Sequence, residues 1–341
     1  MTSALPQAGL LASERPLAEA YDLALVDLDG VARKGHLAIP HAAESLTAAA
    51  TGGLTAIYVT NNASATPEAV AEQLTGLGFI ANASSVMTSA QACAQLLAKE
   101  LAPGSPVLVV GAEALREAVA EQGLSVVASA DERPAAVAQG FSPDLTWAHL
   151  AEAAYAVEQG ARYFASNLDL SLPTARGYAP GNGALVGAVV NATGVGPVSA
   201  GKPNPEMYLL AVGRARATRP LVIGDRLDTD LGGARAAGLP GLHVFTGVSS
   251  ARDAVLAEPH YRPSFLGADL RVLHEPHPLP WQADGGWWLC GPAKARVTGG
   301  RLELAGAPSG LDTVRAACMA VWAAADGGVA VDPTSIPEFE V

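Results

Sequence analysis

Short runs of apolar residues alternate with helix-like stretches from Tyr21 to about Ser250. Within each run the apolar side chains are consecutive, whereas a half-exposed strand would place a polar residue at every second position. Consecutive apolar runs of this length are typical of strands that are buried on both faces of a parallel sheet. The pattern predicts an α/β fold with strands at 23–26, 56–59, 107–110, 221–223 and 242–245.

Helix-start signals lie between these predicted strands. Thr66 followed by Pro67 combines a favoured N-cap with a favoured first helical residue. Asn204-Pro205-Glu206 shows the same helix-start signal. A further short helix is expected at 230–237, with an acidic residue at its start and Gly238 after its end. The turns from strand to helix are where open α/β sheets bind ligands, so polar residues at those turns are the candidates for chemistry.

The segment 84–197 has strand-like runs and helices of its own. Helices are expected at 113–122 and 147–159, and strands at 107–110 and 162–165. A segment this long and regular is not a loop, and we expect an inserted α/β cap domain. The main domain is then formed by two separate parts of the chain, 1–83 and 198–273.

The C-terminal part is expected to be a linker followed by a small α+β appendage. The Pro-rich stretch 274–285 predicts a stiff, non-helical linker. His274 and His277 have ligand-like spacing, but they lack a cluster of Cys or acidic partners, which favours the linker interpretation. In 286–341 the pattern predicts a hairpin at 294–304 and a helix at 311–325. So short a piece cannot bury a core alone. We expect it to dock, anchored by Trp287 and Trp288, on the main domain or on another subunit of a homo-oligomer.

Composition narrows the choice of partner and compartment. The formal net charge is −12, which disfavours nucleic acid and anionic membranes as partners. The three cysteines are few and far apart, as expected in a reducing cytoplasm without disulfides. There is no basic segment followed by an apolar one at the N-terminus, and no apolar run is long enough to span a bilayer. A cytoplasmic protein acting on a small molecule is the expectation.

Polar residues that can carry chemistry follow the predicted strands in order along the chain. They are Asp27, Asp29, Thr60, Asn61, Asn62, Lys202, Asp225 and Asp230. For any one of them alone, a turn, a helix cap or a solvated surface charge is the favoured interpretation. An acid pair, a hydroxyl, a lysine and a second acid pair at successive strand ends instead indicate a Mg²⁺-dependent phosphoryl-transfer site.

The acids of this set have complementary uses. Two unit charges about 4 Å apart at an effective dielectric constant of about 20 interact by about 4 kcal/mol, so carboxylates beside a phosphate require a hard cation. Asp225 with Asp27 and waters is a suitable oxygen shell for Mg²⁺. Asp29 can protonate the leaving oxygen and then activate water, and its backbone carbonyl can face the metal.

The other residues suit the phosphoryl oxygens. The Thr60 hydroxyl and the Asn61 backbone amide can bind them, with Asn62 in the same substrate-binding triplet, and Lys202 supplies a fixed positive charge. Asp230 is better placed to orient Lys202 than to bind the metal.

As a set, these motifs resemble the haloacid dehalogenase-like phosphatases over about 22–273. The motifs are Asp-x-Asp-Gly-Val at 27–31, Thr-Asn-Asn at 60–62, Gly-Lys-Pro at 201–203 and Gly-Asp-x-x-x-x-Asp at 224–230. The insert and Gly35-x-x-x-Ile39-Pro40 resemble the subfamily with a large α/β cap. The resemblance implies a Rossmann-like core and Asp27 as the nucleophile, through an aspartyl-phosphate intermediate. One departure is Ala32-Arg33-Lys34, which is more polar than expected after Asp-Gly-Val and leaves the local loop open.

Within this subfamily the chain looks most like actinobacterial-type glycerol-3-phosphate phosphatases, whose tail resembles part of an acetyltransferase. A Mg²⁺-dependent phosphatase acting on glycerol 3-phosphate is therefore expected, with phosphoglycolate, pyridoxal phosphate or a nucleotide as alternative substrates. Asn167 and Asp169 look like the substrate-facing loop of the cap, although a plain turn is the alternative. The few, scattered aromatic residues of the insert favour a small polyol over a stacked ring.

Two other classes of function remain as alternatives. Phosphorylation-dependent signalling modules also combine an acceptor Asp, a hydroxyl residue and a lysine, but they are smaller, need no cap and lack the second acid of Asp27-x-Asp29. A metal-dependent sugar transferase would use Asp-x-Asp without requiring Lys202 or Asp225.

Overall fold

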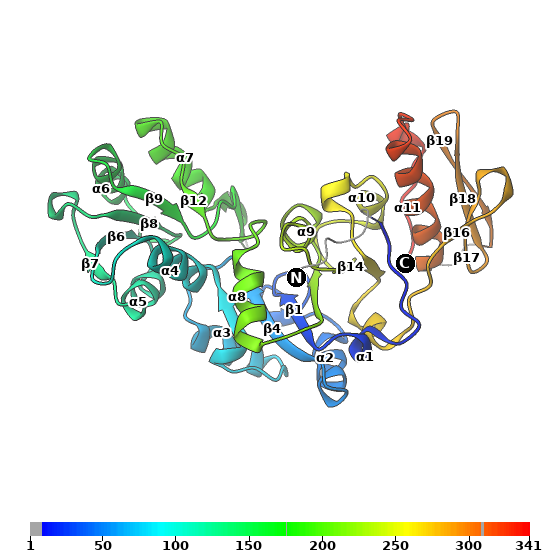
Figure 1. Cartoon of the computed structure of the whole chain (residues 1–341), viewed down its shortest axis with the longest axis horizontal. Helices are drawn as coiled ribbons and strands as arrows, with labels where there is room; N and C mark the ends of the chain where they lie inside the picture. Colours follow the sequence, from blue (N-terminus) through cyan, green and yellow to red (C-terminus); the bar gives the residue numbers. More distant parts are fainter. Residues whose placement is uncertain (1–8, 175, 308–309) are drawn as a thin grey trace. The chain divides into compact units, whose positions relative to one another are not determined.

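The computed structural model describes residues 9–174, 176–307 and 310–341, and the chain divides into two compact units (Figure 1). The first unit comprises 1–58, 76–80 and 212–341, and the second comprises 59–75 and 81–211. The domain boundaries expected from the sequence remain a prediction, since the second unit takes in more of the chain than the segment 84–197.

The six-stranded sheet consists of parallel strands that are mostly buried on both faces, and the first unit supplies most of it. The sheet has the order β15-β14-β13-β1-β4-β5, and β1 and β13 pair in parallel with Val26 opposite Ile223. All the strands predicted for the main sheet are confirmed to within a residue or so. The six strands are β1 (Leu23–Asp27), β4 (Thr55–Thr60), β5 (Val86–Thr88), β13 (Pro220–Gly224), β14 (Gly241–Val244) and β15 (Phe265–Gly267). Of these, β5 and the last two residues of β4 are assigned to the second unit.

The second unit has a parallel sheet and a hydrophobic core of its own. Its sheet has the order β12-β9-β8-β6-β7, and α6 and α7 pack on it through a cluster that includes Val137, Tyr163, Ala156 and Val186. A separate core is what the sequence pattern of an inserted α/β segment predicts. The strands are β6 (Pro106–Val110), β7 (Ser125–Val127), β8 (Ala136–Gln139), β9 (Arg162–Ala165) and β12 (Val198–Ser199).

Helices and two short hairpins complete these two sheets. The hairpins are β2 (Arg33–Lys34) with β3 (Leu37–Ala38), and β10 (Ser171–Thr174) with β11 (Gly177–Pro180). The helices are α1 (Leu17–Ala20), α2 (Ala42–Thr51), α3 (Pro67–Gly76), α4 (Ser89–Glu100), α5 (Glu113–Glu121), α6 (Trp147–Glu158), α7 (Asn182–Thr193), α8 (Glu206–Ala215), α9 (Gly232–Ala236) and α10 (Ala251–Val255).

The C-terminal appendage docks on the main body of the first unit. Helix α11 (Gly310–Asp326) contacts the strands β17, β18 and β19, and its buried side chains form one core with residues of α10 and β15. The predicted hairpin and helix are confirmed, with Gly299 and Gly300 at positive φ in the hairpin turn. The antiparallel strands are β16 (Trp281–Gln282), β17 (Trp288–Cys290), β18 (Ala293–Thr298) and β19 (Arg301–Gly306).

The two tryptophans and the two histidines have structural contacts. Trp288 packs against the appendage core, and the Arg296 guanidinium lies 4.4 Å from the Trp287 ring centroid. His277 is buried, which lowers its pKa to about 4, and its Nε2 lies 3.2 Å from the Val272 carbonyl oxygen. His274 Nε2 contacts the Ser45 carbonyl oxygen at 3.0 Å. Neither histidine belongs to a potential metal-binding group among the described residues.

One predicted element has a different form. The helix expected at 230–237 is a π-helical turn, η3 (Leu227–Leu231), followed by α9. The turn is wide because the Leu231 amide donates to the Arg226 carbonyl, five residues back, and such turns are frequent at functional sites.

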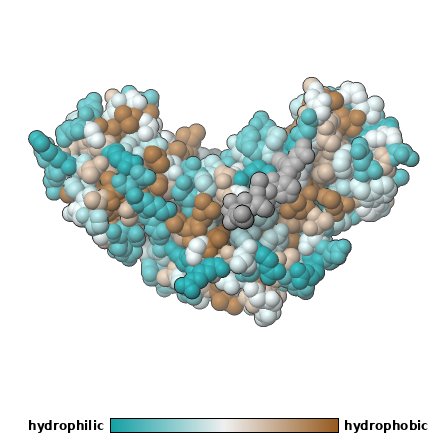
Figure 2. All heavy atoms as spheres, in the orientation of Figure 1, coloured by the Kyte–Doolittle hydropathy of each residue, from teal (hydrophilic) through white to brown (hydrophobic). Residues whose placement is uncertain are grey.

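The remaining sequence expectations concern cysteines and membranes. All three cysteines are free and buried. Within the described ranges, no helix combines the length and apolar character needed to cross a bilayer. On the face shown in Figure 2, apolar side chains occur in several separate places among hydrophilic ones.

Candidate active site

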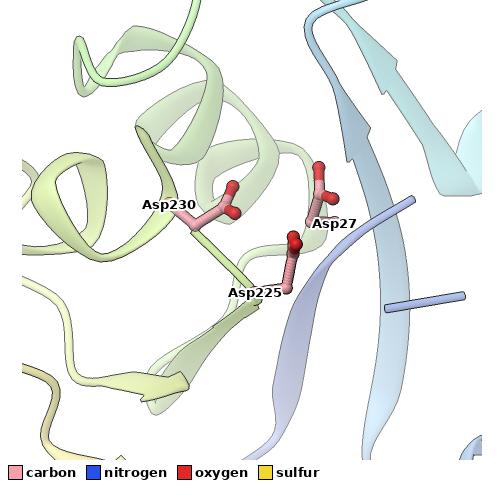
Figure 3. Close-up of side chains that lie close together, drawn as sticks. All are labelled: Asp27, Asp225 and Asp230. Atoms are coloured by element: carbon pink, nitrogen blue, oxygen red, sulfur yellow. The ribbon is translucent and has the colours of Figure 1, made fainter. Parts of the chain in front are cut away.

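Three carboxylates meet where two neighbouring parallel strands end (Figure 3). Asp27 is the last residue of β1, Asp225 directly follows β13, and Asp230 lies in η3. One oxygen from each lies within 4.8 Å of the others, and Asp225 and Asp230 are buried. Because β1 and β13 are adjacent and parallel, their carboxyl ends lie at the same sheet edge, as the sequence pattern predicted.

Backbone groups hold the Asp225 carboxylate in place. The Val248 amide donates to Asp225 Oδ2 at 2.6 Å. A Cβ atom at Gly30 or Gly247 would overlap that same oxygen, and Gly30 also has φ of +99°. Glycine is therefore required at both positions by close approach to Asp225.

The loop after β14 was missed by the sequence reasoning. It supplies Gly247 and Val248 to the Asp225 carboxylate, and the Thr246 hydroxyl donates to the Gly30 carbonyl. The available signal was a Thr-Gly pair that directly follows the predicted strand at 242–245.

Asp230 is fixed by its own turn. The Arg226 amide donates to Asp230 Oδ2 at 3.2 Å, and a Cβ at Gly224 would overlap the Asp230 side chain. Asp228, the other acid of this Asp-x-Asp repeat, instead forms an ion pair of 2.7 Å with Arg226. Asp230 therefore belongs to the group of three carboxylates, whereas Asp228 does not.

Asp29 lies outside the group of three and has a different partner. Its side chain is 60% exposed and forms an ion pair of 3.4 Å with Arg33 Nε. In Ala32-Arg33-Lys34, the polar stretch that departs from the family pattern, Arg33 and Lys34 form one strand of the small hairpin β2–β3. This hairpin places the Arg33 guanidinium beside the Asp29 carboxylate. Predicted metal binding through Asp29 stays a prediction.

A fully buried histidine lies behind the acid cluster. His243 Nε2 is 3.2 Å from the Asp225 carbonyl oxygen. Desolvation lowers the pKa of His243 to about 4, so this ring is neutral at neutral pH. It therefore adds no positive charge that would offset the carboxylates.

In the second unit, the predicted substrate-binding residues form a hydrogen-bonded network. Asn61 follows the end of β4; its Oδ1 accepts from the Lys202 amide at 2.8 Å, and its Nδ2 donates to the Lys202 carbonyl at 3.2 Å. The same Nδ2 lies 3.2 Å from both Asp169 carboxylate oxygens. The Asn167 side chain donates to the Asn61 carbonyl at 2.7 Å. Asn167 and Asp169 thus contact a distant segment of the chain, and their predicted place in a substrate-facing loop stays a prediction.

Two members of the Thr-Asn-Asn triplet have local roles in addition. The Thr60 hydroxyl accepts from the Asn62 amide at 3.1 Å, and Asn62 Oδ1 accepts from the amide and hydroxyl of Ser64 at 2.8 and 2.7 Å. Lys202 is buried, and its Nζ donates to the Val59 carbonyl at 3.4 Å. Asn62 caps the turn that follows it, and its predicted contact with substrate stays a prediction.

The two groups suit different partners. Three clustered carboxylates present hard oxygen donors for a divalent cation. A lysine with hydroxyl and amide groups suits an anionic oxygen-rich group. These are the two components that phosphoryl transfer requires.

Comparison with known proteins gives the same family for two separate stretches of the chain. Residues 24–125 match the family model of haloacid dehalogenase-like hydrolases, and residues 199–273 match a second model of the same kind. Residues 290–336 match a GCN5-related N-acetyltransferase-like domain, in line with the resemblance expected of the appendage.

The similarity to individual relatives covers between about two thirds and nine tenths of the chain. D-glycerol 3-phosphate phosphatase of Mycobacterium tuberculosis is 46% identical over 317 residues, which cover 91% of this chain and 88% of the relative. A crystal structure of glycerol phosphate phosphatase from the same organism, in complex with magnesium, aligns with a TM-score of 0.83 and 46% identity over 91% of this chain and 92% of that one. Acid sugar phosphatase of Staphylococcus saprophyticus is 37% identical over 235 residues, 68% of this chain and 90% of the relative. This chain belongs to the haloacid dehalogenase-like hydrolases.

Proposed function

We propose that the protein is a Mg²⁺-dependent cytoplasmic phosphatase that hydrolyses a small phosphorylated metabolite, with glycerol 3-phosphate as the preferred substrate. The observation that carries the proposal is the group of three carboxylates at the ends of β1 and β13. The choice of substrate is supported by 46% identity to a D-glycerol 3-phosphate phosphatase over 91% of the chain.

The residues present fit a magnesium ion. Asp27 and Asp225 offer carboxylate oxygens, and glycine at positions 30 and 247 leaves room at the Asp225 carboxylate. On this proposal, the backbone carbonyl of Asp29 is a further ligand. Hard oxygen donors are what Mg²⁺ selects. When bound, the ion supplies positive charge against the phosphoryl oxygens. The predicted role of Asp230 in orienting Lys202 stays a prediction.

The reaction proceeds in two displacements at phosphorus. In the first, a carboxylate oxygen of Asp27 forms a bond to phosphorus while the bond to the ester oxygen breaks, and the Asp29 carboxyl gives its proton to the departing alkoxide. In the second, Asp29 takes a proton from water as the water oxygen attacks phosphorus. The bond to Asp27 then breaks, releasing phosphate and restoring the Asp27 carboxylate.

The remaining predicted residues act on the phosphoryl group and the alcohol. On this proposal, the Thr60 hydroxyl, the Asn61 amide and the Lys202 ammonium bind the phosphoryl oxygens and offset the charge that develops on them. Asn167 and Asp169 offer hydrogen-bonding groups for the hydroxyls of a small polyol.

The test is a comparison of substrates by kcat/KM with and without Mg²⁺. Glycerol 3-phosphate is expected to exceed phosphoglycolate, pyridoxal phosphate and a nucleoside monophosphate. If one of these exceeded it by about tenfold, about 1.4 kcal/mol in the transition state, the choice of substrate would be wrong. If none of them, nor p-nitrophenyl phosphate, were hydrolysed with Mg²⁺, the phosphatase proposal itself would be wrong.

A further inference from the structure

The loop that carries Asn167 and Asp169 in the second unit is held by the backbone of another segment. The Gly183 amide donates to the Asp169 carbonyl at 2.9 Å, and the Gly181 amide donates to the Leu170 carbonyl at 2.9 Å. Gly183 is the second residue of α7, and Gly181 is the residue immediately before that helix. These two hydrogen bonds tie the loop to the start of α7.

There is no room for side chains where these backbones meet. A Cβ at Gly181 would overlap the Asp169 carbonyl, and a Cβ at Gly183 would overlap the Leu168 carbonyl. At Gly201, a Cβ would lie 2.9 Å from Asn61 Oδ1. Three glycines thus permit close approach between four chain segments, those at 61, 168–169, 181–183 and 201.

Two asparagine side chains connect these segments. Asn182, 2% exposed, donates from its Nδ2 to the Asn167 carbonyl at 2.7 Å. The Asn167 side chain in turn donates to the Asn61 carbonyl at 2.7 Å. The loop is therefore held on one side by Asn182 and on the other by Asn61.

The chemistry of these contacts specifies an amide at position 61. Its Oδ1 faces a donor, the Lys202 amide, whereas its Nδ2 faces only acceptors, the Lys202 carbonyl and the Asp169 carboxylate. A carboxylate there would place a second acceptor against those acceptors. No charged side chain can both accept from the Lys202 amide and donate to the Lys202 carbonyl and the Asp169 carboxylate in this way.

We propose that Asn61 is a positioning residue, whose side-chain amide fixes the backbone of Lys202 relative to the Asp169 carboxylate. The proposal rests on the proposed function, in which Lys202 binds the phosphoryl group and Asp169 faces the alcohol. One amide then sets the distance between the phosphate-binding lysine and the group that recognises the leaving alcohol. Asn61 consequently affects selectivity between substrates through its side chain, in addition to binding through its backbone.

The direct test is Asn61→Asp, with Asn82→Asp as the matched control. At position 61 the new carboxylate oxygen faces Asp169 and the Lys202 carbonyl, and the like charges repel. At position 82, Oδ1 accepts from the Ser84 and Ser85 amides, and an aspartate keeps those bonds. Amide hydrogen exchange of 167–170 and 201–204 should become faster in Asn61→Asp and remain as in the wild type in Asn82→Asp.

Kinetics separate a positioning role from a merely structural one. With Asn61→Asp, kcat/KM for glycerol 3-phosphate should fall by about 10²-fold, the size of effect seen when a reacting group is displaced by about 1 Å. For p-nitrophenyl phosphate the loss should be several-fold smaller, because that leaving group does not use Asp169. General loosening of the fold would lower both values equally and would overturn the proposal.

Two further variants strengthen the test. Asn61→Ser removes the Nδ2 donor without adding charge, and it should accelerate exchange in the same two segments. Asn61→Asp combined with Asp169→Asn reverses donor and acceptor between these positions, and it should recover protection of 167–170 relative to Asn61→Asp alone.

The outcomes distinguish the two proposals. Exchange in Asn61→Asp and Asn61→Ser equal to that in Asn82→Asp, with kcat/KM for glycerol 3-phosphate within threefold of wild type, would overturn the positioning role. If the wild type hydrolysed no phosphate ester, the proposed function would fall, and hydrogen exchange would still decide whether Asn61 holds the loop to Lys202.

Discussion

Two clusters of charged side chains in the first unit differ in the signs of the charges that they bring together. At the ends of β1 and β13, three carboxylates lie with oxygens within 4.8 Å of one another. Under the appendage, buried Arg262 donates to both oxygens of Asp326 at 2.7 and 2.9 Å, and its guanidinium lies 5.2 Å from the Trp322 ring. The first cluster gathers like charges, and the second pairs opposite ones.

The difference separates function from stability. A bidentate pair with its hydrogen bonds made offsets the desolvation of the arginine, so Arg262 and Asp326 contribute to holding α11 on the main body. Gathered carboxylates contribute nothing comparable until a cation joins them. An arrangement that is unfavourable for the folded protein by itself is typical of an active site. Substitutions in the two clusters should therefore change different properties.

The largest effect is expected from Asp27→Asn. The carboxamide has the same shape but is a poor nucleophile, so kcat should fall by at least about 10³-fold. Because one of three like charges is removed, the free energy of unfolding in chelator should be unchanged or higher. If the variant released phosphate at a rate within tenfold of wild type, Asp27 would not be the nucleophile. A large loss of stability would contradict the view that the carboxylate group does not stabilise the fold.

Removal of divalent metal should come next. Chelation of the wild-type enzyme should reduce activity to near background, and added Mg²⁺ should restore it. Ca²⁺ should inhibit, because its larger and more irregular oxygen shell misaligns the attack. Asp225→Asn should raise the Mg²⁺ concentration needed for half-maximal activity. Full turnover in chelator would contradict the metal assignment outright.

Asp29→Asn should have a smaller effect that depends on the leaving group. Loss of a general acid costs about 10²-fold or more, and alkyl phosphates need that acid more than p-nitrophenyl phosphate does. The measurement is the ratio of kcat/KM for the two substrates in variant and wild type. Equal losses for both would argue against proton donation by Asp29, unless hydrolysis of the aspartyl-phosphate limits both reactions.

The smallest effect on activity is expected at the appendage. Asp326→Asn leaves buried Arg262 without its charged partner, and it should lower the free energy of unfolding by about 1–3 kcal/mol while kcat/KM stays within twofold. Hydrogen bonds from Arg262 lower the pKa of Asp326. The contribution of this pair is therefore present above the unfolded-state pKa of about 3.9 and is lost as pH falls through the lower folded-state value. Urea unfolding between pH 7 and pH 3 checks both statements, and an activity loss larger than the stability loss would count against them.

The sequence by itself determined the parallel sheets and the order of the acids. Consecutive apolar residues at 23–26 and 221–223 are typical of strands with both faces covered. Asp27 follows the first run directly, and Asp225 follows the second after Gly224. Since parallel neighbours end at the same edge, the meeting of these two carboxylates required only local pattern and family resemblance.

Tertiary structure decided the contacts that these residues make. No local sequence pattern predicts the ion pair of Arg33 with Asp29 or the hydrogen bond from the Val248 amide to Asp225. The same is true of the hydrogen bonds that join the Asn61 side chain to Lys202 and Asp169. Asn61 and Lys202 are 141 residues apart in the chain, and Arg262 and Asp326 are 64 apart. Local periodicity reports which face of an element is buried, whereas a hydrogen bond between distant segments depends on ångström-scale positions that only the packed chain fixes.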